Sequence, residues 1–148
     1  MSEQRVKAAI AILYQDNHFL MQLRDDIPGI LYPGCWGFFG GHLELGESPE
    51  EGVKRELLEE IGYVPPTLDL FQHHVDERVL RYVYHGPLTV SVEDLALNEG
   101  WDLGLCSPED VRLGYRYSVK AGQERPFGKP HQAILLDFLA QADLAAEG

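Results

Sequence analysis

The sequence predicts an α/β domain in which helices cover both faces of a mixed β-sheet. Three observations support this fold class. Runs typical of strands precede and follow one internal helix, which favours a sheet rather than a helical bundle. A second helix with an apolar stripe ends the chain. The chain has 148 residues, of which 45% are hydrophobic, so it can build one substantial core. We therefore expect a single domain over residues 1–148.

Strand and loop signals alternate before the internal helix. Apolar runs predict strands, whereas clusters of Gly, Pro, Asp and Asn predict turns and loops. We expect strands at 5–14 and 18–23 joined by a hairpin turn at 16–17, a loop over 24–34, and a short aromatic stretch over 36–39 that the glycines at 40–41 end.

The internal helix carries the clearest local signals in the chain. Ser48 is a favourable N-cap, Pro49 occupies the preferred first helical position, and Glu51 completes a capping box. Gly62 is a typical C-terminal stop, and the prolines that follow at 65–66 forbid continuation. The helix should therefore run from Pro49 to about Ile61.

After this helix, strand-like runs, turn residues and a second capping serine indicate smaller elements. We expect strands at 68–75, 78–84 and 88–92, a turn at 98–100, a short helix after Ser107, a surface loop over 114–129, and a final helix from about Pro130.

The composition excludes several classes of protein. The net charge of −12 argues against a general nucleic-acid binder, which needs a basic surface. The sequence has no apolar run of the roughly 20 residues that a membrane span requires. The N-terminus lacks the pattern of a signal peptide, so we expect a cytoplasmic protein. Two cysteines are too few for a disulfide framework.

The internal helix is strongly acidic. Seven glutamates and only two basic residues give residues 44–60 a net charge of −5. Glu56, Glu59 and Glu60 are spaced i, i+3 and i+4, so they share one helix face. Such carboxylates repel one another unless water or a cation screens them. Oxygen ligands of this kind suit Mg²⁺, with Mn²⁺ as the alternative ion.

The alternative interpretation is a solvated acidic helix face. Two details favour a site instead. The glutamates border the apolar stripe of the helix, and the helix follows a loop containing Gly40, Gly41 and Gly46, whose backbone can approach a ligand closely. Gly52 lies on the carboxylate arc, where we expect a side chain to crowd any bound group.

Residues 41–63, GHLELGESPEEGVKRELLEEIGY, resemble the Nudix box. The match keeps the spacing of the motif throughout, with Tyr63 as the one departure, where the family usually has Ile, Leu or Val. The matching positions are Gly41, Glu47, Arg55, Glu56, Leu57, Glu59, Glu60 and Gly62.

This resemblance implies a Nudix fold, an α/β/α sandwich with a mixed β-sheet, and hydrolysis of a diphosphate bond in a nucleoside diphosphate linked to a group X. It implies that Glu56, Glu59 and Glu60 bind Mg²⁺ with help from the backbone carbonyl of Gly41 or its neighbour. Arg55 would hold the glutamates in place, and Glu47 would orient the loop or serve an outer metal site. The partner would be a small nucleotide derivative rather than a nucleic acid or a membrane, and a homodimer stays open.

The remaining candidates are weaker. The general base would be a box glutamate or a glutamate of a distal loop, for which Glu99 is the candidate. Arg24, at the end of the second expected strand, and His42, beside the box glycine, are candidates for binding the substrate. Group X is left open between a nucleoside triphosphate and a sugar nucleotide.

Two other functions remain as alternatives. One is a non-catalytic module that binds a nucleotide derivative on the same fold, although such modules usually have degraded boxes. The other is an allylic diphosphate isomerase, for which Cys35 is the only thiol near the box.

Overall fold

The computed structural model describes residues 5–147, with side chains through residue 142. These residues form two compact units, one comprising residues 5–14 and 39–98 and the other residues 15–38 and 99–147. The chain therefore crosses from one unit to the other three times.

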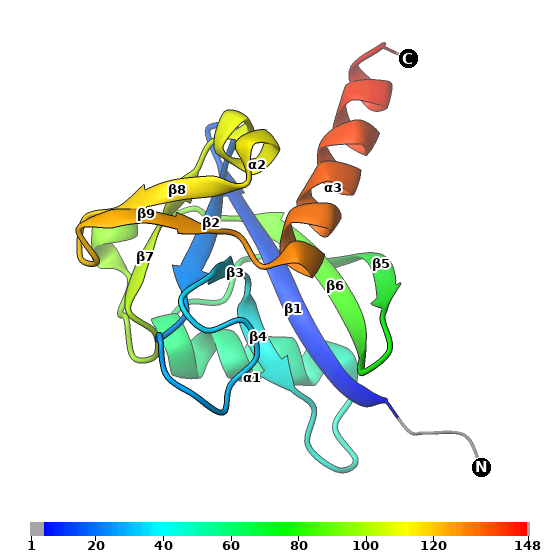
Figure 1. Cartoon of the computed structure of the whole chain (residues 1–148). Coiled ribbons are helices and arrows are strands. Elements are labelled where there is room, and N and C mark those ends of the chain that lie inside the picture. The colour runs from blue at the N-terminus through cyan, green and yellow to red at the C-terminus, as the bar shows by residue number, and fades with distance from the viewer. Residues whose placement is uncertain (1–4, 148) are drawn as a thin grey trace. The chain divides into compact units, whose positions relative to one another are not determined.

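The first unit contains a mixed sheet (Figure 1). Strand β1 pairs antiparallel with β4 and parallel with β6, and β6 pairs antiparallel with β5. The central place of β1 explains its continuous apolar run, because most of its side chains are buried. The strands of this unit are β1 (Val6–Gln15), β4 (Phe39–His42), β5 (Asp69–Val75) and β6 (Val79–Pro87).

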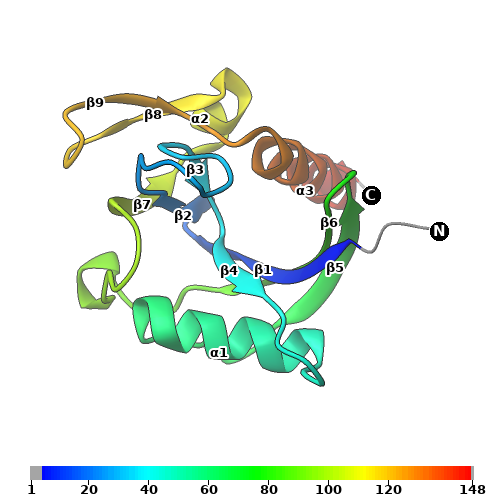
Figure 2. The same ribbon diagram turned by 60° about the horizontal axis from the view of Figure 1, so that its bottom comes forward.

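Helix α1 (Pro49–Ile61) lies against β4 (Figure 2). The predicted capping box is confirmed: the Ser48 hydroxyl accepts from Glu51 N at 3.2 Å, and the Glu51 carboxylate accepts from Ser48 N at 3.0 Å. Gly62 ends the helix in the left-handed conformation, with φ of 69°. The buried stripe of the helix consists of Val53, Leu57 and Ile61.

The prediction that two glycines end the stretch at 36–39 is wrong. Strand β4 continues through Gly40 and Gly41, which face Ile10 and Ala9 of β1. Gly40 has φ of 135°, and a Cβ there would clash with the carbonyl oxygen of Ala9. The glycines therefore permit close pairing with β1 instead of interrupting the strand.

The prediction of a strand at 88–92 is also wrong. Strand β6 ends at Pro87, and the chain instead forms a short 3-10 helix, η1 (Val92–Asp94). Proline has no N–H to donate to a neighbouring strand, so a strand that reaches it loses a ladder bond. The strands expected at 68–75 and 78–84 are confirmed as β5 and β6.

The second unit begins at residue 15, just before the predicted turn, where Asp16 and Asn17 both have positive φ, as a type I′ hairpin turn requires. Strand β2 pairs antiparallel with β3 and β7. Helix α2 packs on α3, where the Gln132 amide donates to the Val111 carbonyl at 2.8 Å. The elements are β2 (His18–Leu23), β3 (Trp36–Gly37), β7 (Asp102–Cys106), α2 (Pro108–Leu113), β8 (Tyr115–Ser118), β9 (Gln123–Pro126) and α3 (Lys129–Glu147).

The prediction of a surface loop over 114–129 is wrong, because β8 and β9 form an antiparallel hairpin there. Strand β7 was not predicted. The short helix after Ser107 is confirmed with its own capping box, and the final helix starts at Lys129. No helix among residues 5–147 is long and apolar enough to cross a membrane.

Candidate functional site

Arg55 is the centre of the charged cluster on α1. Its Nε donates to Glu47 Oε2 at 2.7 Å and its Nη2 to Glu47 Oε1 at 3.0 Å, so the two side chains form a bidentate pair. Its Nη1 donates to Glu56 Oε1 at 2.9 Å and lies 3.3 Å from Glu59 Oε2. The other Nη2 contact is the His42 carbonyl, at 3.2 Å. One guanidinium thus ties the glycine-rich loop to the acidic face of the helix.

The three glutamates predicted to share a face have different environments. Glu60 is 4% exposed, and its Oε1 accepts a hydrogen bond from Gly40 N at 3.0 Å. Glu56 has a side chain 16% exposed beside Arg55, whereas the Glu59 side chain is 59% exposed. Burial is therefore graded across the face, and Glu59 is the carboxylate most open to water.

Gly41 packs directly on the Glu56 carboxylate. A Cβ at this position would lie 2.8 Å from the carboxyl carbon and 2.9 Å from both oxygens. The bare backbone of Gly41 is therefore what allows strand β4 and the carboxylate to approach each other.

We expect Gly41→Ala to displace the Glu56 carboxylate while the fold survives, because the obstructed atoms are the end of a flexible side chain. If Glu56 binds the metal, the Mg²⁺ concentration for half-maximal activity should rise on the order of 10–100-fold, the usual cost of disturbing a ligand's support. A magnesium titration of activity, with a thermal melt to check folding, measures this. An unchanged titration would contradict a metal role for Glu56.

The structure corrects the expectation for Gly52. A Cβ there would clash with Leu43 Cδ2 and lie 3.0 Å from Glu47 Oε1. Gly52 therefore makes room for the loop that carries Glu47, and the obstruction comes from the protein itself rather than from a bound group.

The role of Asn98 is not evident from the sequence. Its side-chain amide donates to the Glu59 carbonyl at 2.9 Å, and its backbone N–H donates to the Glu60 carbonyl at 3.0 Å. Both carbonyls belong to the last turn of α1, where helix carbonyls lack helical partners. The sequence predicts the turn at 98–100, but nothing in it shows that the asparagine caps this helix.

The ion pairs shift the pKa of two groups in opposite directions. The hydrogen bonds from Arg55 and from the Glu44 backbone hold the pKa of Glu47 at about 2, below its ordinary value of 4.5. The hydrogen bond to Glu47 raises the pKa of Arg55, so the guanidinium stays charged. Elsewhere in the same unit, burial would raise the pKa of Asp76, but hydrogen bonds from Arg81, Arg78 N and Val79 N outweigh it and hold this pKa at about 2.

These two carboxylates predict acid sensitivity. Each pKa is lower in the folded chain than its ordinary value of 4.5 for Glu47 or 3.8 for Asp76, so folding favours the charged forms. Their stabilisation is present above these ordinary values and is lost as the pH falls toward about 2. We expect the thermal midpoint to fall over that interval and to fall less steeply in Glu47→Gln and Asp76→Asn. A midpoint that is flat between pH 4.5 and 2 in the wild type would contradict these ion pairs.

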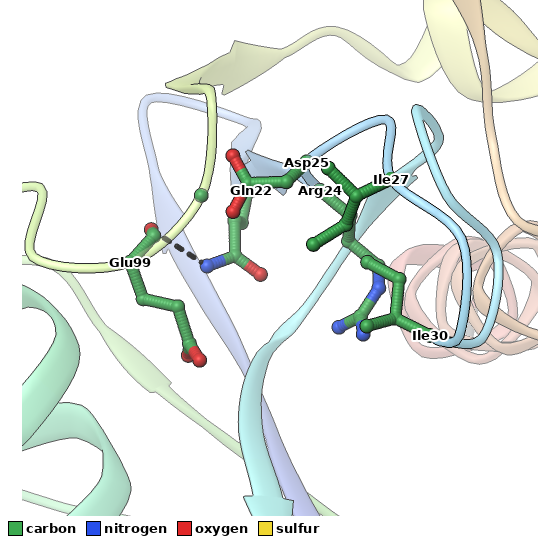
Figure 3. Close-up of a pocket in the computed structure, with 7 residues that line it drawn as sticks. Gln22, Arg24, Asp25, Ile27, Ile30 and Glu99 are labelled. Carbon is green, nitrogen blue, oxygen red and sulfur yellow. Dashed lines mark hydrogen bonds between the residues drawn. The ribbon is translucent and has the colours of Figure 1, made fainter.

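The second unit contains a pocket of about 150 Å³ that includes two of the predicted site residues, Arg24 and Glu99 (Figure 3). The Gln22 amide donates to the Glu99 carbonyl at 2.8 Å. Arg24 donates through Nε to the Leu31 carbonyl at 2.7 Å, which leaves its two Nη groups for other partners. The lining residues are Gln22, Arg24, Asp25, Ile27, Ile30, Glu99 and Gly100.

The residues of α1 fit a hard divalent cation by the chemistry of their donors. Carboxylate and backbone carbonyl oxygens are the ligands that Mg²⁺ prefers, and Gly41 brings the backbone of β4 directly against the Glu56 carboxylate. The described side chains nevertheless include no group of three or more His, Cys, Asp or Glu already arranged around a metal position. Arg55 and Gly40 N instead hold Glu56 and Glu60. The metal role of the glutamates therefore stays a prediction.

Comparison with known proteins identifies the family. The NUDIX domain model matches residues 4–127, so the chain belongs to the Nudix family. The NUDIX domain of Shewanella oneidensis NrtR, solved with ADP ribose, superimposes with a TM-score of 0.68 over 97% of this chain and 90% of that one. At 20% sequence identity this likeness concerns the fold alone. The expected Nudix fold, with a mixed sheet and flanking helices, is confirmed.

Two curated relatives match over shorter stretches. An ADP-ribose pyrophosphatase of Methanocaldococcus jannaschii is 38% identical over 63 residues, which are 43% of this chain and 36% of the relative. An 8-oxo-dGTP diphosphatase of Escherichia coli is 51% identical over 35 residues, or 24% of this chain and 27% of the relative. The matched stretches thus span about a third of these relatives.

Proposed function

We propose that this chain is a Mg²⁺-dependent pyrophosphohydrolase that cleaves a diphosphate bond in a nucleoside diphosphate linked to a group X. The observation that carries this proposal is the Arg55 cluster. The guanidinium holds Glu47 and Glu56 in fixed positions on the face that also carries Glu59. The alternative of a solvated acidic face does not require this network, since free glutamates would need no bidentate partner.

In this proposal Glu56, Glu59 and Glu60 bind Mg²⁺ together with the Gly41 carbonyl. Bound Mg²⁺ would neutralise the diphosphate, polarise its phosphoryl oxygens and lower the pKa of water. Arg55 orients the carboxylates, and Glu47 fixes Arg55. A carboxylate then takes the proton of the attacking water. Glu59 is our first candidate for this base because it is the most exposed of the three. Glu99 is the distal candidate.

We propose that the pocket of the second unit binds a polar ring or sugar of a nucleotide derivative. The pocket combines the apolar side chains of Ile27 and Ile30 with the Arg24 guanidinium, whose two Nη groups can donate to a ligand. This combination suits a polar ring or a sugar. His42 is exposed, with its carbonyl bonded to Arg55, so its ring is available for a phosphate contact.

The two relatives support two classes of substrate, ADP-ribose and an oxidised nucleoside triphosphate. The test is incubation of the chain with Mg²⁺ and ADP-ribose, 8-oxo-dGTP, dGTP or a uridine sugar nucleotide, followed by mass spectrometry. A nucleoside monophosphate with pyrophosphate identifies a triphosphate substrate, and a monophosphate with a sugar phosphate identifies a sugar nucleotide. Tight binding without any product would instead favour the non-catalytic module.

A further inference from the structure

The pocket of the second unit is bounded by two chain segments. One is the loop after β2, which contributes Arg24, Asp25, Ile27 and Ile30, and the other contains Glu99 and Gly100. The segments are joined at the end of β2, where Trp101 N donates to the Leu23 carbonyl at 2.8 Å. The separation of the two segments across the pocket therefore depends on the contacts that hold the outer part of the loop after β2.

Arg125 of β9 contacts both segments. Its Nε donates to the Gly34 carbonyl at 2.8 Å, and its Nη2 lies 3.9 Å from Asp26 Oδ2. Its guanidinium carbon lies 6.0 Å from the centre of the Trp101 ring, at the outer limit of a cation–π contact. The Arg125 side chain is only 20% exposed and is not among the residues that line the pocket.

Gly34 makes room for this arrangement. It has φ of 66°, and a Cβ at this position would clash with Arg125 Nη2 and lie 3.1 Å from the Asp26 carboxyl carbon. The loop thus has a residue without a side chain where the guanidinium enters. A side chain at position 34 would therefore push the loop away from Arg125.

We infer that Arg125 is a positioning residue for substrate selection. It holds the loop over residues 25–34 beside Trp101, and so fixes the shape of the pocket without lining it. This inference rests on the proposed function, because it takes the pocket to bind the nucleotide derivative that is hydrolysed. Its consequence is that Arg125 governs the KM rather than the kcat.

Arg116 provides a matched control. It is the register partner of Arg125 in the β8–β9 hairpin, and its guanidinium lies 4.9 Å from the Trp36 ring. Its Nε donates to the Leu105 carbonyl at 3.2 Å, and it does not line the pocket. Substituting it disturbs the same hairpin and a similar tryptophan contact, but leaves the loop at 25–34 attached to Arg125.

The experiment compares Arg125→Gln, Arg125→Lys and Arg116→Gln with the wild type. Digestion with an Asp-specific protease, followed at Asp25 and Asp26, reports the freedom of the loop. The KM and kcat for 8-oxo-dGTP and ADP-ribose with Mg²⁺ report selection. In Arg125→Gln we expect faster cleavage of the loop and a KM raised about tenfold, which corresponds to about 1.4 kcal/mol, with kcat within about twofold. The KM and the loop cleavage of Arg125→Lys, which keeps the charge but not the planar fork, should lie between those of the wild type and Arg125→Gln. Arg116→Gln should keep the wild-type KM and loop cleavage.

Loop cleavage in Arg125→Gln at the wild-type rate would overturn the inference, as would faster cleavage with an unchanged KM. If the wild type hydrolyses neither probe, the proposed function fails, and calorimetric affinity for the same probes replaces the KM. Weaker binding by Arg125→Gln than by Arg116→Gln would then support the inference, and equal or undetectable binding would overturn it.

Discussion

Glu59→Gln is expected to abolish most of the hydrolysis while leaving the fold intact. The substitution removes one negative charge from the face formed by Glu56, Glu59 and Glu60, and the carboxylate it removes is the most open to water of the three and our candidate for the base. Loss of a positioned acid–base group costs on the order of 10²–10⁴ in rate. The side chain is 59% exposed and its contact with Arg55 is long, at 3.3 Å, so stability should hardly change. Steady-state kinetics with a saturating substrate, beside a thermal melt, measures both.

Glu50→Gln is the matched control for this substitution. Glu50 lies on the same helix and is also exposed, but its partner is Lys54 at 3.1 Å. The Glu50→Gln variant should keep the wild-type rate of hydrolysis. Equal activity of Glu59→Gln and Glu50→Gln would mean that the position of the charge on α1 has no catalytic significance, and would refute the assigned role.

Arg55→Ala should be the second most damaging change. Without the guanidinium, Glu47 loses both of its hydrogen bonds from Arg55, and Glu56 loses its 2.9 Å partner. The carboxylates then repel one another and no longer hold fixed positions. We expect kcat/KM to fall on the order of 10–100-fold, as when the partners of metal ligands are removed, and more Mg²⁺ to be needed for half-maximal activity.

Two further variants sharpen this result. Arg55→Lys keeps the charge but has no planar fork, so it should recover only a small part of the activity. Lys54→Ala, which removes the neighbouring charge and only its surface pair with Glu50, should be nearly neutral. Activity of Arg55→Ala within twofold of Lys54→Ala would show that the network around Arg55 is not needed.

Helix α1 could be predicted closely because its signals are local. Ser48, Pro49, Glu51 and Gly62 each act on neighbouring backbone groups, so their effect does not depend on the rest of the fold. The shared face of the glutamates also follows from helical spacing alone. Which of them would be buried could not be predicted, since the burial of Glu60 depends on Gly40, twenty positions away in the chain.

Strand β7 illustrates what the sequence conceals. Its buried face consists of Asp102, Gly104 and Cys106, whereas Leu103 and Leu105 are only half-buried, so the apolar residues of the sequence mark the wrong face. Distant residues complete this face: the Ser118 hydroxyl donates to the Asp102 carboxylate at 2.7 Å, and the Arg116 guanidinium occupies the space beside Gly104. The hairpin of β8 and β9 was mistaken for a loop for a related reason, because its arginines pack on Trp36 and Trp101 rather than forming an apolar core.

The most direct test of the central claim is one assay of product release. Wild type and Glu59→Gln are each incubated with ADP-ribose and with 8-oxo-dGTP, with Mg²⁺ and with a chelator, and the nucleoside monophosphate is quantified. We predict that the wild type releases the monophosphate from at least one substrate when Mg²⁺ is present and from neither in the chelator. Glu59→Gln should release it at least on the order of a hundredfold more slowly. Release that persists in the chelator, or that Glu59→Gln matches, would contradict a carboxylate-held metal site on α1.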